Sequence, residues 1–175
     1  MRIFLIIIVS FFILNCSGNK MKPTDFKGQK PRLIIEDYLE GKVKAWGILQ
    51  NRSGKVTRQF TADLDGKWDG SFLTLDETFN WSDGEVQTRQ WKIKKINEHN
   101  YEGTASDVVG LAKGFSYGPA FKFEYVLLVP VKGKEIKITF DDWIFKQDDK
   151  VAINRATMTK FGIKVAELTV LFVKE

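Results

Sequence analysis

The chain has 175 residues, of which 43% are hydrophobic, and its formal net charge at pH 7 is +5. This length is enough for one domain with a real hydrophobic core and too short for two. The chain has neither a compact basic cluster nor a nucleic-acid-binding signature, which excludes nucleic acid as a partner.

Residues 1–15 have the layout of a secretory signal peptide. A positive start is followed by an apolar run over residues 3–14, which is too short to span a bilayer. Cys16, the only cysteine, follows at once, as in a bacterial lipobox. We therefore expect cleavage before Cys16 and its acylation, for example with palmitate, and an anchor in the outer membrane facing the periplasm. The alternative is an ordinary signal peptide with a chance cysteine.

Residues 16–31 are expected to form a lipidated N-terminus and a flexible tether, followed by one domain over residues 32–175. The tether is basic, so it would gain from lying on anionic head groups, although a soluble linker is nearly as compatible. Its lysines are Lys20, Lys22, Lys27 and Lys30. The segment 31–39, with proline in its first turn and Gly41 after its end, predicts one short helix.

The rest of the chain alternates between apolar and polar residues with a period of two, which is typical of β-strands. Many consecutive hairpins in a single domain usually close into a barrel. We therefore predict an all-β, antiparallel, up-and-down, lipocalin-like barrel of about nine strands, within a range of 8–10. The turn signals lie at 51–54, 65–66, 82–84, 97–100, 132–133 and 147–150.

Turn chemistry predicts which residues face one another across the first hairpins. A three-residue loop at 82–84, with Gly84 in a left-handed conformation, places Glu77 opposite Arg89. A two-residue turn at 65–66 would place Arg58 opposite Leu73 on the same face of the sheet.

The later hairpins give two further pairs. A turn at 132–133 places Tyr125 opposite Phe140, and a four-residue loop at 147–150 would place Asp142 opposite Arg155. In the sequence "FDDWIF", Asp142 then points inward and Asp141 faces water. Adjacent residues of a strand lie on opposite faces, so these two carboxylates cannot form a catalytic pair or share a metal ion.

These registers predict a network of charged and polar side chains inside the apolar barrel. In one interpretation, the arginines and a tyrosine form a site that holds an anion. In the other, which is slightly favoured, the charges satisfy one another and only fix the strand register. The predicted members are Arg58, Glu77, Arg89, Asp107, Tyr125, Asp142 and Arg155.

Several stretches together resemble a bacterial lipoprotein family of unknown function, the domain-of-unknown-function family 3833. The resemblance covers nearly the whole mature chain and implies Asp107, Asp142 and Arg155 as charged motif positions, supported by Glu77 and Arg89. The gene neighbourhood of the family implies a link to fatty acyl chains. The stretches are "AWG" at 45–47, "SDGE" at 82–85, "GTASDVVGLAKG" at 103–114, "FDDWIF" at 140–145 and "INRATMTKFG" at 153–162.

The residue inventory argues against an enzyme. His99 is the only histidine and lies in a turn. The sequence therefore lacks the histidines that a catalytic triad, a haem site or a zinc site usually requires. Glu77 and Asp142 are each expected opposite an arginine, which should keep them ionised and make them poor general acids. We expect no metal and no cofactor.

The leading functional hypothesis is a membrane-tethered, non-enzymatic barrel that binds or carries an acyl chain or another small hydrophobic anion. A void of at least ~300 Å³ with an unpaired arginine would favour it. The second hypothesis is a structural or interaction lipoprotein with a filled barrel. The third is an enzyme acting on lipids. In the second hypothesis a protein partner would contact one of the tryptophans Trp46, Trp68, Trp81 and Trp143.

Overall fold

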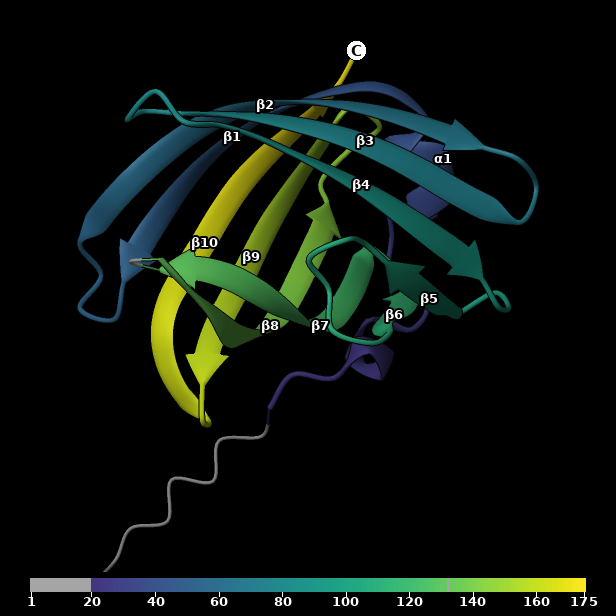
Figure 1. Ribbon diagram of the computed structural model, residues 1–175. Helices are drawn as coiled ribbons and strands as arrows, with labels where there is room; N and C mark the ends of the chain where they lie inside the picture. Colours follow the sequence, from purple (N-terminus) through teal and green to yellow (C-terminus); the bar gives the residue numbers. More distant parts are fainter. Residues whose placement is uncertain (1–19, 132) are drawn as a thin grey trace, which may run out of the picture.

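Ten antiparallel strands form one closed barrel in the computed structural model, which describes residues 20–131 and 133–175 (Figure 1). The predicted signal peptide and Cys16 lie outside the described residues. The elements are η1 (Pro23–Phe26), α1 (Ile35–Leu39), β1 (Gly41–Asn51), β2 (Val56–Trp68), β3 (Phe72–Trp81), β4 (Val86–Lys95), β5 (Asn100–Thr104), β6 (Ala112–Tyr117), β7 (Ala120–Val131), β8 (Lys134–Lys146), β9 (Val151–Lys160) and β10 (Ile163–Lys174).

The topology is the predicted up-and-down order. Each strand pairs with the next one in the sequence, and β1 pairs with β10 to close the barrel. Inward side chains alternate with outward ones, and the inward ones form the hydrophobic core. The predicted fold class is confirmed.

Helix α1 is shorter than the predicted helix over residues 31–39. The backbone before it is extended because Leu33 is held on both sides: its N–H donates to the Gly118 carbonyl (2.8 Å), and its carbonyl accepts from the Ser116 hydroxyl (2.8 Å). The Tyr38 hydroxyl donates to the carbonyls of Lys150 and Phe172. These bonds fix α1 across one end of the barrel.

Buried Glu36 also holds α1 in place. Its carboxylate accepts a hydrogen bond from the Tyr101 hydroxyl (2.9 Å) and pairs with Lys95. Among residues 20–131 and 133–175, no helix is long and apolar enough to cross a membrane.

Part of the segment that the sequence assigns to a tether lies against the barrel. The Phe26 ring of η1 packs on Trp143 and Phe145, with ring centres 6.1 and 5.5 Å away. It covers the outer face of β8, and this cover explains why Trp143, an outward residue of that strand, is only 6% exposed.

The two predicted registers around the loops at 82–84 and 132–133 are confirmed. Glu77 faces Arg89, and Tyr125 faces Phe140. Both loops have the predicted length, so each inward residue keeps its predicted neighbour.

The predicted turn at Asp65–Gly66 is wrong, because β2 continues through it to Trp68, which pairs with Leu73. Gly66 serves a different purpose there: a Cβ at this position would lie 1.9 Å from the Leu39 carbonyl oxygen. The glycine allows α1 to approach the sheet closely. The chain turns instead at 69–71.

The predicted register between β8 and β9 is wrong by one residue. Arg155 faces Trp143, and Asp142 faces Ala156. The Gln147 N–H donates to the Val151 carbonyl, so 147 faces 151 and the loop is residues 148–150, one residue shorter than predicted. A shift of one residue moves every side chain of a strand to the other face.

Candidate functional site

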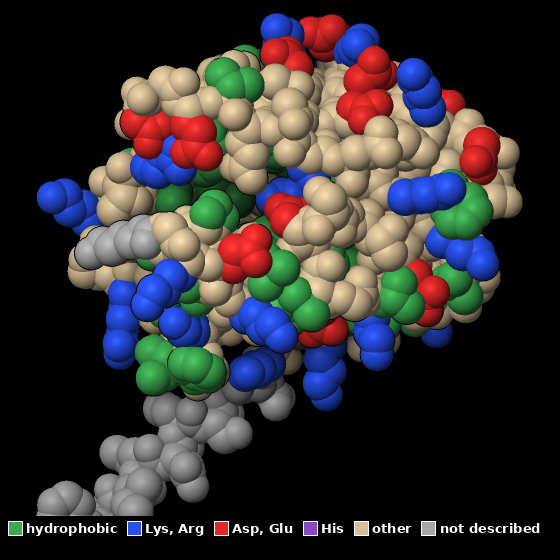
Figure 2. All heavy atoms as spheres, viewed as in Figure 1, with side chains coloured by type: hydrophobic (Ala, Val, Ile, Leu, Met, Phe, Trp, Pro, Cys, Tyr) green, Lys and Arg blue, Asp and Glu red, His purple; other side chains and the backbone are tan. Residues whose placement is uncertain are grey.

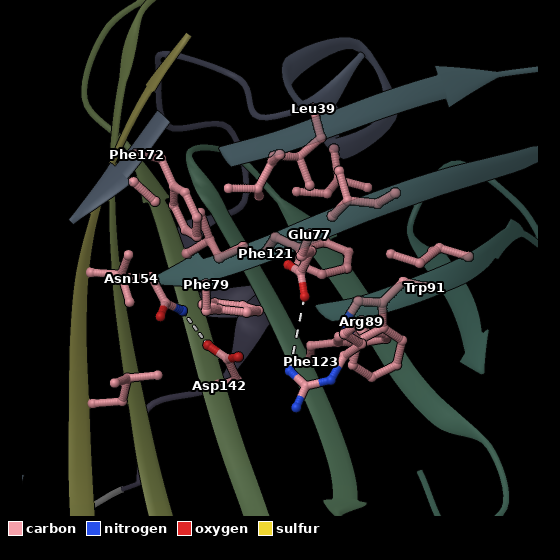
Figure 3. Close-up of a pocket in the computed structure, with 18 of the residues that line it drawn as sticks. Leu39, Glu77, Phe79, Arg89, Trp91, Phe121, Phe123, Asp142, Asn154 and Phe172 are labelled. Atoms are coloured by element: carbon pink, nitrogen blue, oxygen red, sulfur yellow. Dashed lines mark hydrogen bonds and ion pairs between the residues drawn. The ribbon is translucent and has the colours of Figure 1, made fainter. Parts of the chain in front are cut away.

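A cavity of about 100 Å³ lies inside the barrel, below α1. Most of its lining is apolar and aromatic, and a few polar side chains point into it from β3, β4, β7, β8 and β9 (Figure 3). Figure 2 shows that one face of the barrel is hollowed, with hydrophobic side chains inside the hollow. The polar lining residues are Glu77, Arg89, Tyr125, Asp142 and Asn154.

Arg89 is the cation of this cluster, and its side chain is 14% exposed. Its guanidinium donates to both carboxylate oxygens of Asp107, from Nε at 3.1 and 3.0 Å and from Nη2 at 2.7 Å. Its Nη1 lies 3.8 Å from Oε2 of Glu77. Arg89 is therefore bound in a two-pronged ion pair to Asp107 and only approaches Glu77.

Asp107 comes from the loop between β5 and β6 rather than from a strand. Its carbonyl accepts a hydrogen bond from the Leu128 N–H (2.9 Å), and the next residue, Val108, bridges to Leu127. The loop is thus attached to β7, and this attachment places the Asp107 carboxylate beside the Arg89 guanidinium. The structure places this residue in the network, as the sequence suggested.

Asp142 points inward, as predicted, but its partners are not arginines. The Tyr125 hydroxyl donates to its Oδ2 (2.8 Å), and the Asn154 side-chain amide donates to its Oδ1. The same amide also donates to the Trp143 carbonyl (3.0 Å). Asn154 is 4% exposed and was missed by the sequence analysis, because the predicted register placed it on the outer face.

Glu77 has the fewest polar contacts of the cluster members. Its Oε2 is buried and has no hydrogen-bond partner among the described residues. Burial, helped by the charges of Asp142 and Asp107 and opposed by Arg89, raises the pKa of Glu77 to about 7. Burial likewise raises the pKa of Asp142 to about 6, although the bonds from Tyr125 and Asn154 oppose the shift.

These shifts overturn one argument from the sequence. Opposing arginines were expected to hold Glu77 and Asp142 ionised. Instead Arg89 is committed to Asp107, and desolvation dominates at both carboxyl groups. A carboxyl group with a pKa near 7 can give or take a proton at neutral pH, so the chemistry of the site does not exclude acid–base catalysis.

Two predicted members lie elsewhere. Arg155 is on the outer face, 63% exposed, and pairs with Glu167 of β10. Arg58 lies at the rim of the barrel, where it donates to Asp83 and Glu85 of the β3–β4 turn, both at 2.7 Å. Without them, the cluster has three carboxyl groups around one guanidinium. The unpaired arginine that would have favoured a carrier is not found in the cluster, and Oε2 of Glu77 has no hydrogen bond among the described residues.

Glycines make room for the aromatic side chains of the lining. A Cβ on Gly103 would lie 2.4 Å from the Phe123 ring, and one on Gly114 would lie 2.9 Å from the Phe121 ring. Gly103 and Gly114 therefore permit the aromatic rings to approach the backbone closely. Phe123 also packs on Trp91, with ring centres 5.0 Å apart.

The four tryptophans considered as partner contacts differ in exposure. Trp46 is 46% exposed on the outer face of β1, whereas Trp143 is covered by η1. Trp68 and Trp81 are half-buried.

In the described part of the chain, no group of three or more His, Cys, Asp or Glu side chains is arranged to hold a metal ion.

Fold and site together define the class of the protein. It is an up-and-down antiparallel barrel with a small charged cluster in an otherwise apolar interior, an architecture compatible with the binding of small ligands. The chain belongs to the family described as Protein of unknown function (DUF3833), which matches residues 10–174. The family resemblance seen in the sequence is confirmed. A search of curated proteins gives no match.

Solved structures show the same fold in distant proteins. The chain is similar to an S-type phycobiliprotein lyase from Guillardia theta, with a TM-score of 0.60, 10% identity, and coverage of 80% of this chain and 90% of that one. It is also similar to a protein of unknown function of the DUF3598 family from Nostoc punctiforme, with a TM-score of 0.62 and 13% identity. That match covers 84% of this chain and about half, 51%, of the other.

Proposed function

We propose that the barrel binds a small, largely apolar ligand whose polar end reaches Glu77 and Asp142. The observation that carries this proposal is the buried Oε2 of Glu77, which has no hydrogen-bond partner among the described residues and lines the cavity. A buried carboxylate oxygen without a donor costs free energy, and a ligand that supplies the donor recovers it.

The charge of the cluster selects the chemistry of that polar end. Its single guanidinium is committed to Asp107, whereas Asp142 accepts hydrogen bonds and Oε2 of Glu77 has no donor among the described residues. An amine or a hydroxyl therefore complements the site better than the anionic head group that the sequence suggested. The apolar part of the ligand remains, in this proposal, an acyl or alkyl chain.

The size of the cavity favours a second candidate. About 100 Å³ is well below the ~300 Å³ at which typical ligand pockets begin. A longer chain would have to displace aromatic side chains such as Phe79 or Phe123. A structural or interaction protein with a nearly filled barrel, presenting Trp46, is the alternative that this volume supports. An enzyme acting on lipids ranks third.

A matched ligand series separates the two candidates. The whole protein is titrated with a straight-chain amine, alcohol and carboxylate of equal chain length, and the melting temperature is followed at about pH 8. We expect stabilisation in the order amine, alcohol, carboxylate, because Glu77 is ionised above its pKa of about 7. Glu77→Gln should remove the advantage of the amine, and the outer-face variant Arg155→Gln should keep it. Equal responses to all three compounds, or none, would favour the filled barrel.

We further propose that Cys16 is lipidated and tethers the barrel to the envelope, on the periplasmic side of the outer membrane. The support is the order of positive start, apolar run and cysteine in residues 1–16. Labelled palmitate should enter the full chain and should not enter Cys16→Ser. Separation of inner and outer membranes then tests the location, and a label retained in Cys16→Ser would contradict the tether.

A further inference from the structure

Phe161 in the β9–β10 turn has no structural reason to be phenylalanine. Its side chain is 92% exposed, so it contributes nothing to the core. Its φ angle is +52°, and the next residue, Gly162, has a φ of +76°. Two-residue turns with two positive φ angles usually contain Asn-Gly, because a bulky residue is strained there. The turn therefore keeps an exposed aromatic ring at a cost in stability.

The surroundings of this ring are apolar and basic. Ile163 is 55% exposed beside it, and the Lys160 ammonium lies 5.4 Å from the centre of the Phe161 ring. The exposed Lys164 follows, and it pairs with Glu167. One hairpin tip thus presents two large apolar side chains between two lysines.

The neighbouring hairpin has the same character. Thr139 of β8 pairs with Thr159 of β9, so the β9–β10 turn lies beside the part of β8 near Lys137, and the β7–β8 hairpin extends beyond it. The β7–β8 tip exposes Val131 (41%) together with Lys134 and Lys137, against a single acid, Glu135. Figure 2 shows basic side chains around exposed hydrophobic ones in the lower left of this face.

We propose that these two hairpin tips, residues 131, 133–137 and 159–164, form a surface that docks onto a lipid bilayer with anionic head groups. Exposed aromatic and aliphatic side chains ringed by lysines match the boundary between acyl chains and negative head groups. The described lysines outnumber the acids here, and Phe161 is the most exposed of the large hydrophobic side chains at the two tips. This inference is independent of any ligand in the barrel.

Site-specific probes on the full chain test the docking. In a Cys16→Ser background, a polarity-sensitive fluorophore is attached to Glu135→Cys at the hairpin tips or to Ser71→Cys in the β2–β3 turn, near α1. The chain is reconstituted in phosphatidylcholine vesicles with and without phosphatidylglycerol. We expect the probe at 135 to shift to shorter wavelength and to be quenched by lipid-borne quenchers when phosphatidylglycerol is present. The probe at 71 should remain in water.

Two sets of variants, each carrying the probe at 135, identify the groups responsible. Phe161→Asn installs a residue that suits the turn, so the fold keeps its melting temperature or gains slightly, while the ratio of docked to undocked tips falls about tenfold. Lys160→Gln and Lys164→Gln should each lower that ratio about fivefold.

Three results would overturn the inference: a probe at 135 that stays in water, a probe equally buried on neutral vesicles, and a Phe161→Asn variant that docks like the parent. Burial of the probe only in native membranes that contain proteins would also reject it, in favour of a protein partner.

Discussion

Glu77 and Arg89 face each other directly across β3 and β4, yet their nearest charged atoms are 3.8 Å apart because the guanidinium is turned toward Asp107. The cross-strand pair that the sequence predicts therefore exists as a neighbour relationship and not as a hydrogen-bonded ion pair. Glu77 is left to face the cavity, and its burial decides its protonation.

Stability should fall as the pH rises from about 5 to 8. The pKa of Glu77 is raised from 4.5 to about 7, so the folded protein holds this proton more tightly than the unfolded chain. The stabilisation is complete below the unfolded pKa and is lost as the pH rises through 7, by roughly 2 kcal/mol in this window. Urea unfolding at both pH values measures it. Glu77→Gln should reduce the slope and leave the smaller share that comes from Asp142, whose pKa is also raised, to about 6. An unchanged slope in this variant would contradict the assignment.

Replacing Arg89 should be far more damaging than replacing Arg155. Arg89→Met leaves half-buried Asp107 and the largely buried Glu77 without their cation, which should cost about 3–5 kcal/mol in the free energy of unfolding. Arg155→Met breaks an exposed pair with Glu167 and should cost less than about 1 kcal/mol. Chemical denaturation measures the free energy of unfolding of both variants. Similar losses of stability would contradict the different environments assigned to the two arginines.

Asn154 should control the proton affinity of Asp142. In Asn154→Ala, the carboxylate loses a hydrogen-bond donor, so the pKa of Asp142 should rise above its value of about 6. Carboxyl NMR titration measures this shift, and the free energy of unfolding should fall by about 1–3 kcal/mol. Asn80→Ala, at an exposed position of β3, is the matched control. The same Asp142 pKa in both variants would show that Asn154 does not influence this carboxylate.

Gly103→Ala should disturb the cavity through Phe123. The added methyl group would lie 2.4 Å from the Phe123 ring, which must shift, at a cost of about 1–3 kcal/mol. Phe123→Leu should relieve this clash, so the double variant should lose less stability than the two single losses together. A thermal or urea double-mutant cycle measures the coupling, and strict additivity would show that the ring does not limit this position.

The sequence predicts the barrel and five of the seven network members, largely because both follow from alternation and from loops of known length. The loop at 82–84 has its glycine in the left-handed conformation, with a φ of +88° at Gly84, so the pairing of Glu77 with Arg89 is set by local chemistry. The turn at 132–133 likewise fixes Tyr125 against Phe140.

The errors come from contacts that no local pattern encodes. Gly66 looks like a turn residue, but a helix distant in sequence requires its lack of a side chain. At the β8–β9 loop, the bond from the Gln147 N–H to the Val151 carbonyl leaves only residues 148–150 in the loop, one fewer than predicted. This moves Asn154 into the barrel and Arg155 out of it. Of the two, only Asn154 reaches Asp142.

The pairing of β1 with β10 has a consequence for how the molecule assembles. Val43 meets Lys174, so the seam joins the two ends of the described fold. Such long-range closure is slow, and until the final strand arrives both seam edges expose unpaired peptide groups. A chain synthesised from its N-terminus can therefore close the barrel only after β10 has been made, and a premature stop before β10 would yield an open, aggregation-prone sheet.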